Sequence, residues 1–415
     1  MIDTETIKKI EEKVYLILPV FDEKNVEERI SEAISLVESS GAECVGYGIQ
    51  KIREINPATL FGTGKLEEMK REAEEKNATT VICDYALSPA QTANISDCFE
   101  MKTLDKTALI LDIFALNAKT DEGKLQVEVA QLEYLLPRLK GQGNSLSRLG
   151  GGIGTRGPGE TKLETDRRHI LSRIKNLKDK LKRLEARRDL QNDRREKNGA
   201  LGVALAGYTN SGKSTLLNLL SGSDVLSENR LFATLDPTAR KVKLGKTDVI
   251  LFDTVGFIRD IPTNLIEAFK STLSCVKTAD LILNVCDLTR DFEAQNKVTE
   301  SILEEIGVTS PIIKVFNKCD EISDFTLCDK NASIISAKKN IGIDELKKRI
   351  EKCFENLFTE RKLTFPFSEQ NLVFKLKKYA EHTVVEYHDD CIEATFRIRK
   401  SNLPNFSEIL KSKGQ

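Results

Sequence analysis

One glycine-rich stretch carries the residue types that hold phosphate groups. Residues 207–215 read G-Y-T-N-S-G-K-S-T, which matches the pattern G-x-x-x-x-G-K-S. The apolar run 203–206 precedes it as an expected strand, and leucines at helical spacing follow it, so the loop joins a strand to a helix. Backbone N–H groups of such a loop surround phosphate oxygens, and the helix dipole adds to the attraction. The predicted nucleotide-binding residues here are Gly207, Tyr208, Thr209, Asn210, Ser211, Gly212, Lys213, Ser214 and Thr215.

Two side chains of this loop have predicted chemical roles. Lys213 is expected to reach the β- and γ-phosphates, which makes it a candidate catalytic residue. The Ser214 hydroxyl is expected to bind Mg²⁺. A chance glycine-rich turn would not need the flanking strand and helix, so we favour a phosphate site.

Three further motifs follow in the chain. D-T-V-G at 253–256 ends an apolar run; its carboxylate could hold the metal through water, and its glycine N–H could approach the γ-phosphate. N-K-C-D at 317–320 ends another apolar run, and a carboxylate there accepts from the ring N–H and the exocyclic amine of guanine, an amine that adenine lacks. S-A-K at 336–338 could complete the base pocket. The candidate binding residues are Asp253, Thr254, Val255, Gly256 (also a catalytic candidate), Asn317, Lys318, Cys319, Asp320, Ser336, Ala337 and Lys338.

Together the four motifs predict a GTP-binding domain, and they resemble the loops of the translation-factor-related GTPases. Any one of these motifs is weak by itself. Their order along the chain, and the apolar runs that precede them, carry the prediction.

Bulk composition excludes several classes of protein. A chain of 415 residues is long enough for two to four domains. It has no run of about 18 apolar residues and no basic start followed by an apolar core, so we expect neither a transmembrane helix nor secretion. The nine cysteines contain no C-x-x-C pair, which favours reduced core thiols. The three histidines are scattered, so we expect no His-rich metal site. The expected location is the cytoplasm, without stable membrane insertion.

Charge is distributed unevenly. The whole chain has a net charge of −1, whereas residues 138–197 contain 18 Lys and Arg against 8 Asp and Glu. A basic arm on an acidic body indicates a polyanionic partner that is met through this one segment.

Residues 1–118 alternate strand-like and helix-like runs, which predicts an N-terminal α/β domain. The tetrapeptide G-T-G-K at 62–65 is too short for a phosphate cradle, so we expect a turn and a helix start there. The expected strands lie at 14–18, 44–49, 79–83 and 107–113, and the expected helices at 26–37 and 66–75.

Residues 119–198 form an expected linker of a glycine-rich loop and two helices. A helix is predicted over 120–139, and the glycine-rich stretch 141–160 follows. Part of it matches G-x-G-x-x-G, but no strand precedes it and Pro158-Gly159 interrupts any following helix, so we reject a dinucleotide site. We favour a loop that is ordered or binds a partner over a passive linker, because arginines among glycines can approach phosphates closely.

A long charged helix is expected from Glu164 to about Glu196. Its apolar residues repeat at spacings of 4, 3, 4 and 3, which is the seam of a coiled coil. Two heptads are too few for an isolated dimer, so we predict a monomer in which this helix and the 120–139 helix form a hairpin. The seam residues are Ile170, Ile174, Leu177, Leu181 and Leu184.

The predicted fold class is α/β, with two further parts after the linker. Residues 199–358 should form the GTPase domain around a mostly parallel sheet. Residues 359–415 should form a small α+β domain with a helix near 372–379, a hairpin over 382–398 and a last helix capped by Ser401 or Asn402.

Longer motifs make the resemblance specific. The run R-L-G-G-G-I-G-T-R-G-P-G-E-T-K-L-E-T-D-R-R at 148–168 resembles the signature of the HflX family of GTPases, as do F-A-T-L-D-P-T at 232–238 and D-T-V-G-F-I-R at 253–259. Residues 108–115 and 123–128 are similar to that family's N-terminal domain. The resemblance covers about residues 10–350. It implies binding to the large ribosomal subunit and its rRNA, and splitting or rescue of stalled ribosomes under stress. It also implies a location on ribosomes and peripherally at the membrane.

The resemblance also suggests how GTP is hydrolysed to GDP and phosphate. The predicted switch residues are Phe232, Ala233, Thr234, Leu235 and Asp236. Thr234 matches the family's switch threonine, a candidate for catalysis and for Mg²⁺ binding, with Thr238 as the alternative. Phe257 stands where many GTPases have a glutamine that orients water, so we expect slow intrinsic turnover that the ribosome stimulates. Asn210 either helps to hold K⁺ against the phosphates or merely shapes the loop.

Two other functions stay open at this stage. One is an RNA-remodelling NTPase whose N-terminal domain uses ATP, although no full phosphate loop precedes residue 200. The other is a GTP-gated binding module in which hydrolysis only resets affinity.

Overall fold

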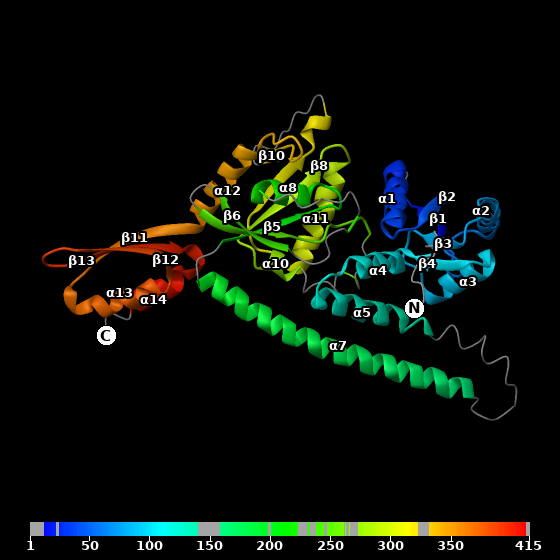
Figure 1. Cartoon of the computed structure of the whole chain (residues 1–415), viewed down its shortest axis with the longest axis horizontal. Coiled ribbons are helices and arrows are strands. Elements are labelled where there is room, and N and C mark those ends of the chain that lie inside the picture. Colours follow the sequence, from blue (N-terminus) through cyan, green and yellow to red (C-terminus); the bar gives the residue numbers. More distant parts are fainter. Residues whose placement is uncertain are drawn as a thin grey trace, which may run out of the picture.

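The computed structural model describes residues 12–21, 25–139, 158–197, 201–222, 231–232, 238–244, 247–260, 262, 265, 273–322 and 332–411. Figure 1 shows a central domain between an N-terminal domain at one end and a C-terminal domain at the other, with the long helix α7 (Pro158–Lys197) running beneath the central and N-terminal domains. None of the described helices combines the length and the apolar character needed to span a bilayer.

The N-terminal domain is built on a four-stranded parallel sheet in the order β2-β1-β3-β4. β1 and β3 are the two central strands of this sheet and are almost entirely buried. Their sequences are therefore short apolar runs and do not alternate between apolar and polar residues. The strands are β1 (Lys13–Val20), β2 (Glu43–Lys51), β3 (Thr80–Cys83) and β4 (Lys102–Asp105), and the helices are α1 (Val26–Ser39), α2 (Thr63–Glu75), α3 (Pro89–Phe99) and α4 (Lys106–Asn117).

The predicted strand at 107–113 was wrong, because these residues lie in helix α4. Asp105 caps the helix by accepting a hydrogen bond from the Ala108 N–H at 2.8 Å. Most of α4 is buried, so its sequence is apolar on all sides and lacks the helical period that would have distinguished it from a buried strand. The fourth strand is instead the four-residue β4 just before it. The G-T-G-K tetrapeptide contains the start of α2, as predicted.

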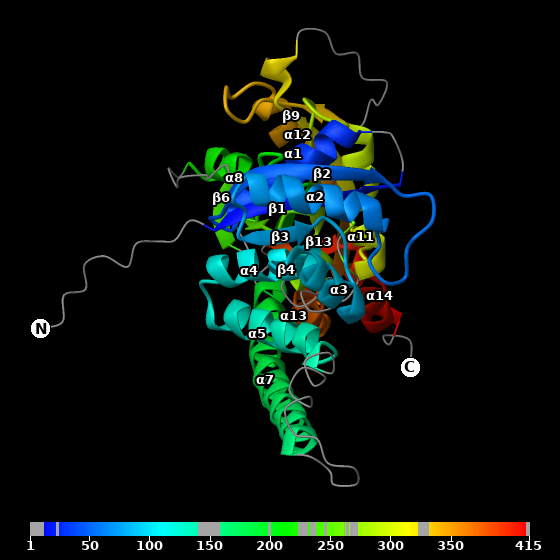
Figure 2. The ribbon, with the colours of Figure 1, turned by 90° about the vertical axis from the view of Figure 1, so that its right-hand side faces the viewer.

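The linker contains α5 (Asp121–Leu135) and α7, which pack side by side (Figures 1 and 2). Ile174 and Leu177 of the predicted seam are buried. Two ion pairs, Arg173–Glu128 at 2.7 Å and Lys178–Glu133 at 2.6 Å, flank them. The predicted packing of the two helices is therefore confirmed. α7 begins at Pro158, six residues earlier than expected, because proline is well suited to the first turn of a helix. Residues 141–157 lie outside the described residues.

The linker is fixed to the N-terminal domain through the buried Asp105 carboxylate. The Tyr134 hydroxyl donates to it at 2.8 Å and the Arg138 guanidinium at 2.9 Å. The guanidinium also lies 3.5 Å from the centre of the Tyr134 ring. One buried carboxylate thus joins the start of α4 to the end of the α5 segment.

The central domain has a six-stranded sheet in the order β10-β9-β8-β5-β7-β6, in which only β6 runs antiparallel to its neighbour. This is the mostly parallel sheet that the sequence predicts. Its strands are β5 (Leu201–Gly207), β6 (Thr238–Leu244), β7 (Thr247–Asp253), β8 (Leu281–Asp287), β9 (Ile312–Asn317) and β10 (Ser333–Ile334), and its helices are α8 (Lys213–Ser221), α10 (Ser274–Lys277), α11 (Phe292–Ile306) and α12 (Ile343–Leu357).

The C-terminal domain is a three-stranded antiparallel sheet in the order β11-β13-β12, covered by two helices. The buried residues of β13 alternate with half-buried ones, as expected for a sheet with one covered face. The predicted helix and hairpin are present, and the last helix begins at Leu403, after Asn402. The elements are β11 (Phe358–Phe365), α13 (Gln370–Lys377), β12 (Ala380–Tyr387), β13 (Ile392–Arg399) and α14 (Leu403–Lys411).

Candidate functional site

The phosphate loop joins β5 to α8 at the carboxyl end of the central sheet. Gly207 has φ +144°, and a Cβ there would lie 2.2 Å from the Val285 carbonyl oxygen. Gly212 has φ +92°, and a Cβ there would lie 2.2 Å from the Asn317 side-chain nitrogen. Both positions therefore need glycine, for conformation and for space. The loop folds tightly over the sheet and leads directly into the first turn of α8.

Lys213 and Ser214 lie at the start of α8. The Lys213 ammonium is buried and donates to the carbonyl oxygens of Tyr208 at 2.7 Å and Gly207 at 3.2 Å. Burial lowers the pKa of Lys213 to about 8, against the opposing influence of the Asp253 carboxylate. The Ser214 hydroxyl donates to Asp253 at 2.6 Å, so the two predicted metal-site residues meet directly.

The second switch segment, defined here as residues 253–260, lies directly on the phosphate loop. The Phe257 carbonyl accepts from the Thr209 N–H at 2.7 Å, and the Phe257 N–H donates to the Gly207 carbonyl at 3.1 Å. A Cβ on Gly256 would lie 2.7 Å from the Thr209 methyl group and 2.9 Å from the Lys213 nitrogen. The segment packs so closely that only glycine fits at 256.

The two loops predicted to hold the base are joined to each other and to the phosphate loop. The Asn317 side chain donates to the Ser211 carbonyl at 2.9 Å and accepts from the Ala337 N–H at 2.9 Å. A hydrogen bond from Ser336 lowers the pKa of Asp320, with Lys339 contributing. Asp320 thus favours the ionised form, which is the acceptor that guanine requires.

These residues fit a nucleotide with Mg²⁺. The Thr209 and Ser211 hydroxyl oxygens are buried in the loop without a hydrogen-bond partner, which is costly unless a polar ligand reaches them. The Ser214 hydroxyl and the Asp253 carboxylate are oxygen donors of the kind that Mg²⁺ prefers. The predicted loops at 207–215, 253–256, 317–320 and 336–338 all meet at one edge of the sheet.

Several predicted residues lie elsewhere. The Phe232 side chain is buried against Phe114 of α4, with ring centroids 4.8 Å apart, and its carbonyl accepts from Asn117 at 3.0 Å. Val255 packs into the same apolar cluster rather than toward the loop. Thr238 is exposed at the start of β6. Ala233, Thr234, Leu235 and Asp236 lie outside the described residues.

Sequence reasoning missed Asp287 at the end of β8. Its carboxylate accepts from the Lys318 ammonium at 2.6 Å and from the Thr289 hydroxyl at 2.7 Å, and so fixes the lysine of the N-K-C-D motif. The signal was available, because Asp287 ends the apolar run 281–286 at the same edge as the other motifs. The signal for Asp287 was weaker than the signals for the other site residues, because Asp287 is not part of a recognised sequence motif.

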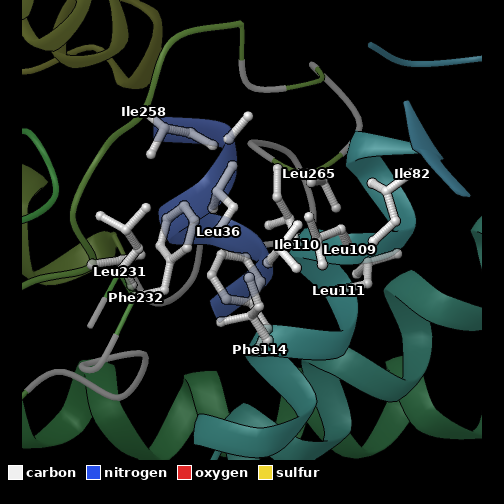
Figure 3. Close-up of a cluster of buried hydrophobic side chains, with 14 of the residues drawn as sticks. Leu36, Ile82, Leu109, Ile110, Leu111, Phe114, Leu231, Phe232, Ile258 and Leu265 are labelled. Carbon is white, nitrogen blue, oxygen red and sulfur yellow. The ribbon is translucent and has the colours of Figure 1, made fainter. Parts of the chain in front are cut away.

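The site also includes part of the N-terminal domain, which no local pattern indicated. An apolar cluster joins α1 and α4 to residues 231–232 and to Val255 and Ile258 of the second switch segment (Figure 3). Polar contacts border it: the Leu231 N–H donates to Ser39 at 3.0 Å, and Arg259 pairs with Glu28 at 3.0 Å.

Three features define the class of protein. The phosphate loop follows a central strand, its Ser214 bonds to the Asp253 carboxylate, and the N-K-C-D loop is hydrogen-bonded to the phosphate loop through Asn317. This is a P-loop GTPase, which hydrolyses GTP to GDP and phosphate. Three family profiles match along the chain: "GTP-binding GTPase N-terminal" at residues 27–115, "GTP-binding GTPase Middle Region" at 117–195 and "50S ribosome-binding GTPase" at 202–318.

Relatives of nearly the same length identify the family. The chain is 47% identical to the GTPase HflX of Caldanaerobacter subterraneus over 92% of this chain and 88% of that protein. It is 43% identical to the GTPase HflX of Lacrimispora saccharolytica over 93% of both chains. It is 42% identical to the GTPase HflX of Escherichia coli over 76% of this chain and 74% of that protein. The chain belongs to the HflX family of GTPases.

Proposed function

We propose that this GTPase is a nucleotide-controlled factor that binds the large ribosomal subunit through α7 and that splits or rescues stalled ribosomes under stress. The name of the family profile that matches the central domain, a 50S ribosome-binding GTPase, supports the partner. The observation that carries the proposal is the exposed basic surface of α7 on a chain with a GTPase site.

The α7 surface fits RNA better than protein. Arg168, Lys175 and Lys182 are exposed and lie seven residues apart, on the side of the helix opposite the buried Ile174 and Leu177. Such a row can follow a phosphate backbone, and binding through phosphates is strong, independent of sequence and weakened by salt. The acidic partners Glu128 and Glu133 pair with lateral residues, which leaves this row facing away from α5.

In the proposed reaction, the chain's own residues position the triphosphate. The Lys213 ammonium neutralises charge on the β- and γ-phosphates, and the Gly256 N–H contacts the γ-phosphate. The Asp320 carboxylate selects guanine, and Asn317 keeps this loop aligned with the phosphate loop. Bound Mg²⁺, held by Ser214 and by Thr234, would neutralise charge that develops on the phosphates. Phe257 cannot orient a water molecule, so the ribosome is expected to accelerate turnover.

K⁺ is a second proposed cofactor, bound by Asn210. This residue has φ 60° at the tip of the phosphate loop, a conformation that asparagine tolerates better than most residues, so shaping the loop is its alternative role. Turnover with ribosomes should be faster in KCl than in NaCl. Equal rates in the two salts would reject the K⁺ role.

Co-sedimentation with purified large subunits tests the ribosome proposal. The protein should pellet with a slowly hydrolysed GTP analogue and far less with GDP. The triple variant Arg168→Glu, Lys175→Glu, Lys182→Glu should weaken binding by more than about tenfold, and should lower the slope of log affinity against log salt by about 2–3.

A matched control carries the same charge change on other exposed lysines: Lys348→Glu, Lys352→Glu and Lys377→Glu on α12 and α13. This control should bind as the parent protein does. Equal loss in both triple variants, or binding that ignores the nucleotide, would contradict the proposal. Splitting is tested separately, by the release of small subunits from intact ribosomes.

A further inference from the structure

One side chain of the phosphate loop turns away from the nucleotide. The Tyr208 ring is 3% exposed and lies in the apolar cluster with α1 and α4, beside Val255 and Ile258. Figure 3 shows Leu36 of α1, Phe114 of α4 and Ile258 converging in this cluster. A residue that belongs to the phosphate loop by sequence is therefore part of the core between two domains.

The Tyr208 hydroxyl joins three segments. It donates to the buried Glu32 carboxylate of α1, and it accepts from the Arg259 N–H of the second switch segment at 2.8 Å. Burial and the adjacent Glu32 carboxylate raise the pKa of Tyr208, so the hydroxyl keeps its proton to donate. The other Glu32 oxygen is buried without a hydrogen-bond partner, which makes the Tyr208 bond costly to lose.

The neighbouring contacts fix the same two segments. The Arg259 guanidinium pairs with Glu28, one turn before Glu32 on α1, at 3.0 Å. Glu28 also accepts from the Asp291 N–H at 3.1 Å, and the Asp291 carboxylate accepts from Asn25 at 2.6 Å. α1 therefore contacts the second switch segment and the start of α11 together.

This arrangement holds the second switch segment against the phosphate loop. Two backbone hydrogen bonds join Phe257 to Thr209 and Gly207. The Thr209 N–H of the phosphate loop therefore donates to the Phe257 carbonyl and not to a phosphate oxygen. A Cβ added at Gly256 would lie 2.9 Å from the Lys213 nitrogen, so little space separates the two residues. A γ-phosphate between Gly256 and Lys213 requires the segment to move outward, which would pull the Arg259 N–H away from Tyr208. GDP has no γ-phosphate and makes no such demand.

We propose that Tyr208 is a positioning residue that sets the preference between GTP and GDP, because its hydroxyl links the place of the second switch segment to the docking of the N-terminal domain. Entry of the γ-phosphate and docking of α1 oppose each other through this hydroxyl, which acts together with the Arg259–Glu28 pair and the apolar cluster. By thermodynamic linkage, weakening the contact between α1 and the second switch segment raises the affinity for GTP relative to GDP, and GTP weakens that contact by the same free energy. The inference rests on GTP binding and is independent of the ribosome.

The test uses the full-length protein without ribosomes. Affinities for GDP and for a slowly hydrolysed GTP analogue are measured by displacement of a fluorescent nucleotide. Tyr208→Phe keeps the ring and removes only the hydroxyl, so the ratio of the two affinities should shift toward the analogue by about tenfold, the size expected for a hydrogen bond to a charged group. Glu32→Gln should shift the ratio in the same direction, and the double variant should shift it by less than the product of the two single effects.

Tyr15→Phe is the matched control. The Tyr15 hydroxyl donates to Glu72 at 2.6 Å within the N-terminal domain, and Tyr15 belongs to the cluster on the face of the sheet that holds none of the described switch residues. This variant should leave the affinity ratio unchanged while losing a similar hydrogen bond. Small-angle X-ray scattering adds a second readout: the analogue should enlarge the parent protein, and Tyr208→Phe should already be enlarged with GDP. An unchanged ratio in Tyr208→Phe and Glu32→Gln, or an equal shift in Tyr15→Phe, overturns the proposal, whatever the ribosome assays give.

Discussion

The two outer domains contact the GTPase domain at opposite ends of its sheet. The N-terminal domain packs at the carboxyl ends of the strands, on the phosphate loop and the second switch segment. The C-terminal domain attaches near the amino ends, where Arg399 pairs with Asp280 at 2.9 Å just before β8 and the Asp280 carboxylate also accepts from the Gly202 N–H at 2.8 Å. One domain can respond to the nucleotide directly, and the other has no contact through which to do so among the described residues.

The two junctions also differ in kind. α12 ends at Leu357 and β11 begins at Phe358, so the chain enters the C-terminal domain without a loop. The Phe358 side chain packs in the core of the GTPase domain. The N-terminal junction instead combines an apolar cluster with hydrogen bonds between separate segments, and we propose that this junction opens and closes with the nucleotide. We therefore expect a fixed attachment at one end of the GTPase domain and a releasable one at the other end, which carries the nucleotide site.

The largest expected effect comes from removing the lysine of the phosphate loop. Lys213→Ala removes the ammonium that is expected to hold the phosphates, so GTP turnover should fall by more than about 100-fold. The change in scattering size between GDP and the analogue should disappear with it. Measuring phosphate release checks the first expectation.

Lys65→Ala is the matched control for that variant. Lys65 lies in the G-T-G-K tetrapeptide and pairs with Glu68 at 2.7 Å. Its loss should change turnover by less than about twofold, as expected for a surface substitution. A large loss of ATP or GTP turnover in Lys65→Ala would instead support a second nucleotide site in the N-terminal domain.

An intermediate effect is expected from the apolar part of the N-terminal junction. Phe114→Ala removes the ring that packs on Phe232 and should lower the free energy of unfolding of the N-terminal domain by about 3 kcal/mol. It should also shift the nucleotide preference toward GTP. Phe99→Ala, in the cluster on the other face of the N-terminal sheet, should cost about as much stability. If both variants shifted the preference equally, the junction would have no special part in it.

The smallest effect is expected at the C-terminal junction. Arg399→Met removes a partly exposed ion pair while Asp280 keeps its bond to the Gly202 N–H, so the free energy of unfolding should fall by about 1 kcal/mol. The ratio of GTP to GDP affinity should stay within about twofold of the parent value. Urea unfolding and the displacement assay measure the two quantities. A large change in the ratio would mean that the C-terminal domain also responds to the nucleotide.

The sequence indicated the central domain well because its signals are local. Each motif ends an apolar run, so parallel strands bring the motifs to one edge without further information. The error at 107–113 arose because a helix buried on most sides has no period, and the cap at Asp105 lay outside the run considered. The bond between Tyr208 and Glu32 joins residues 176 positions apart, and no short pattern can specify such a pair.

Helix α7 has 40 residues and spans about 60 Å, and its described ion pairs with α5 lie in its middle part. A rigid rod of this length magnifies rotation at its base. If the N-terminal domain turned by about 5° when its junction opened, the far end of α7 would sweep through about 5 Å, roughly one helical turn. A small displacement of the second switch segment could in this way become a movement large enough to reposition a whole RNA contact.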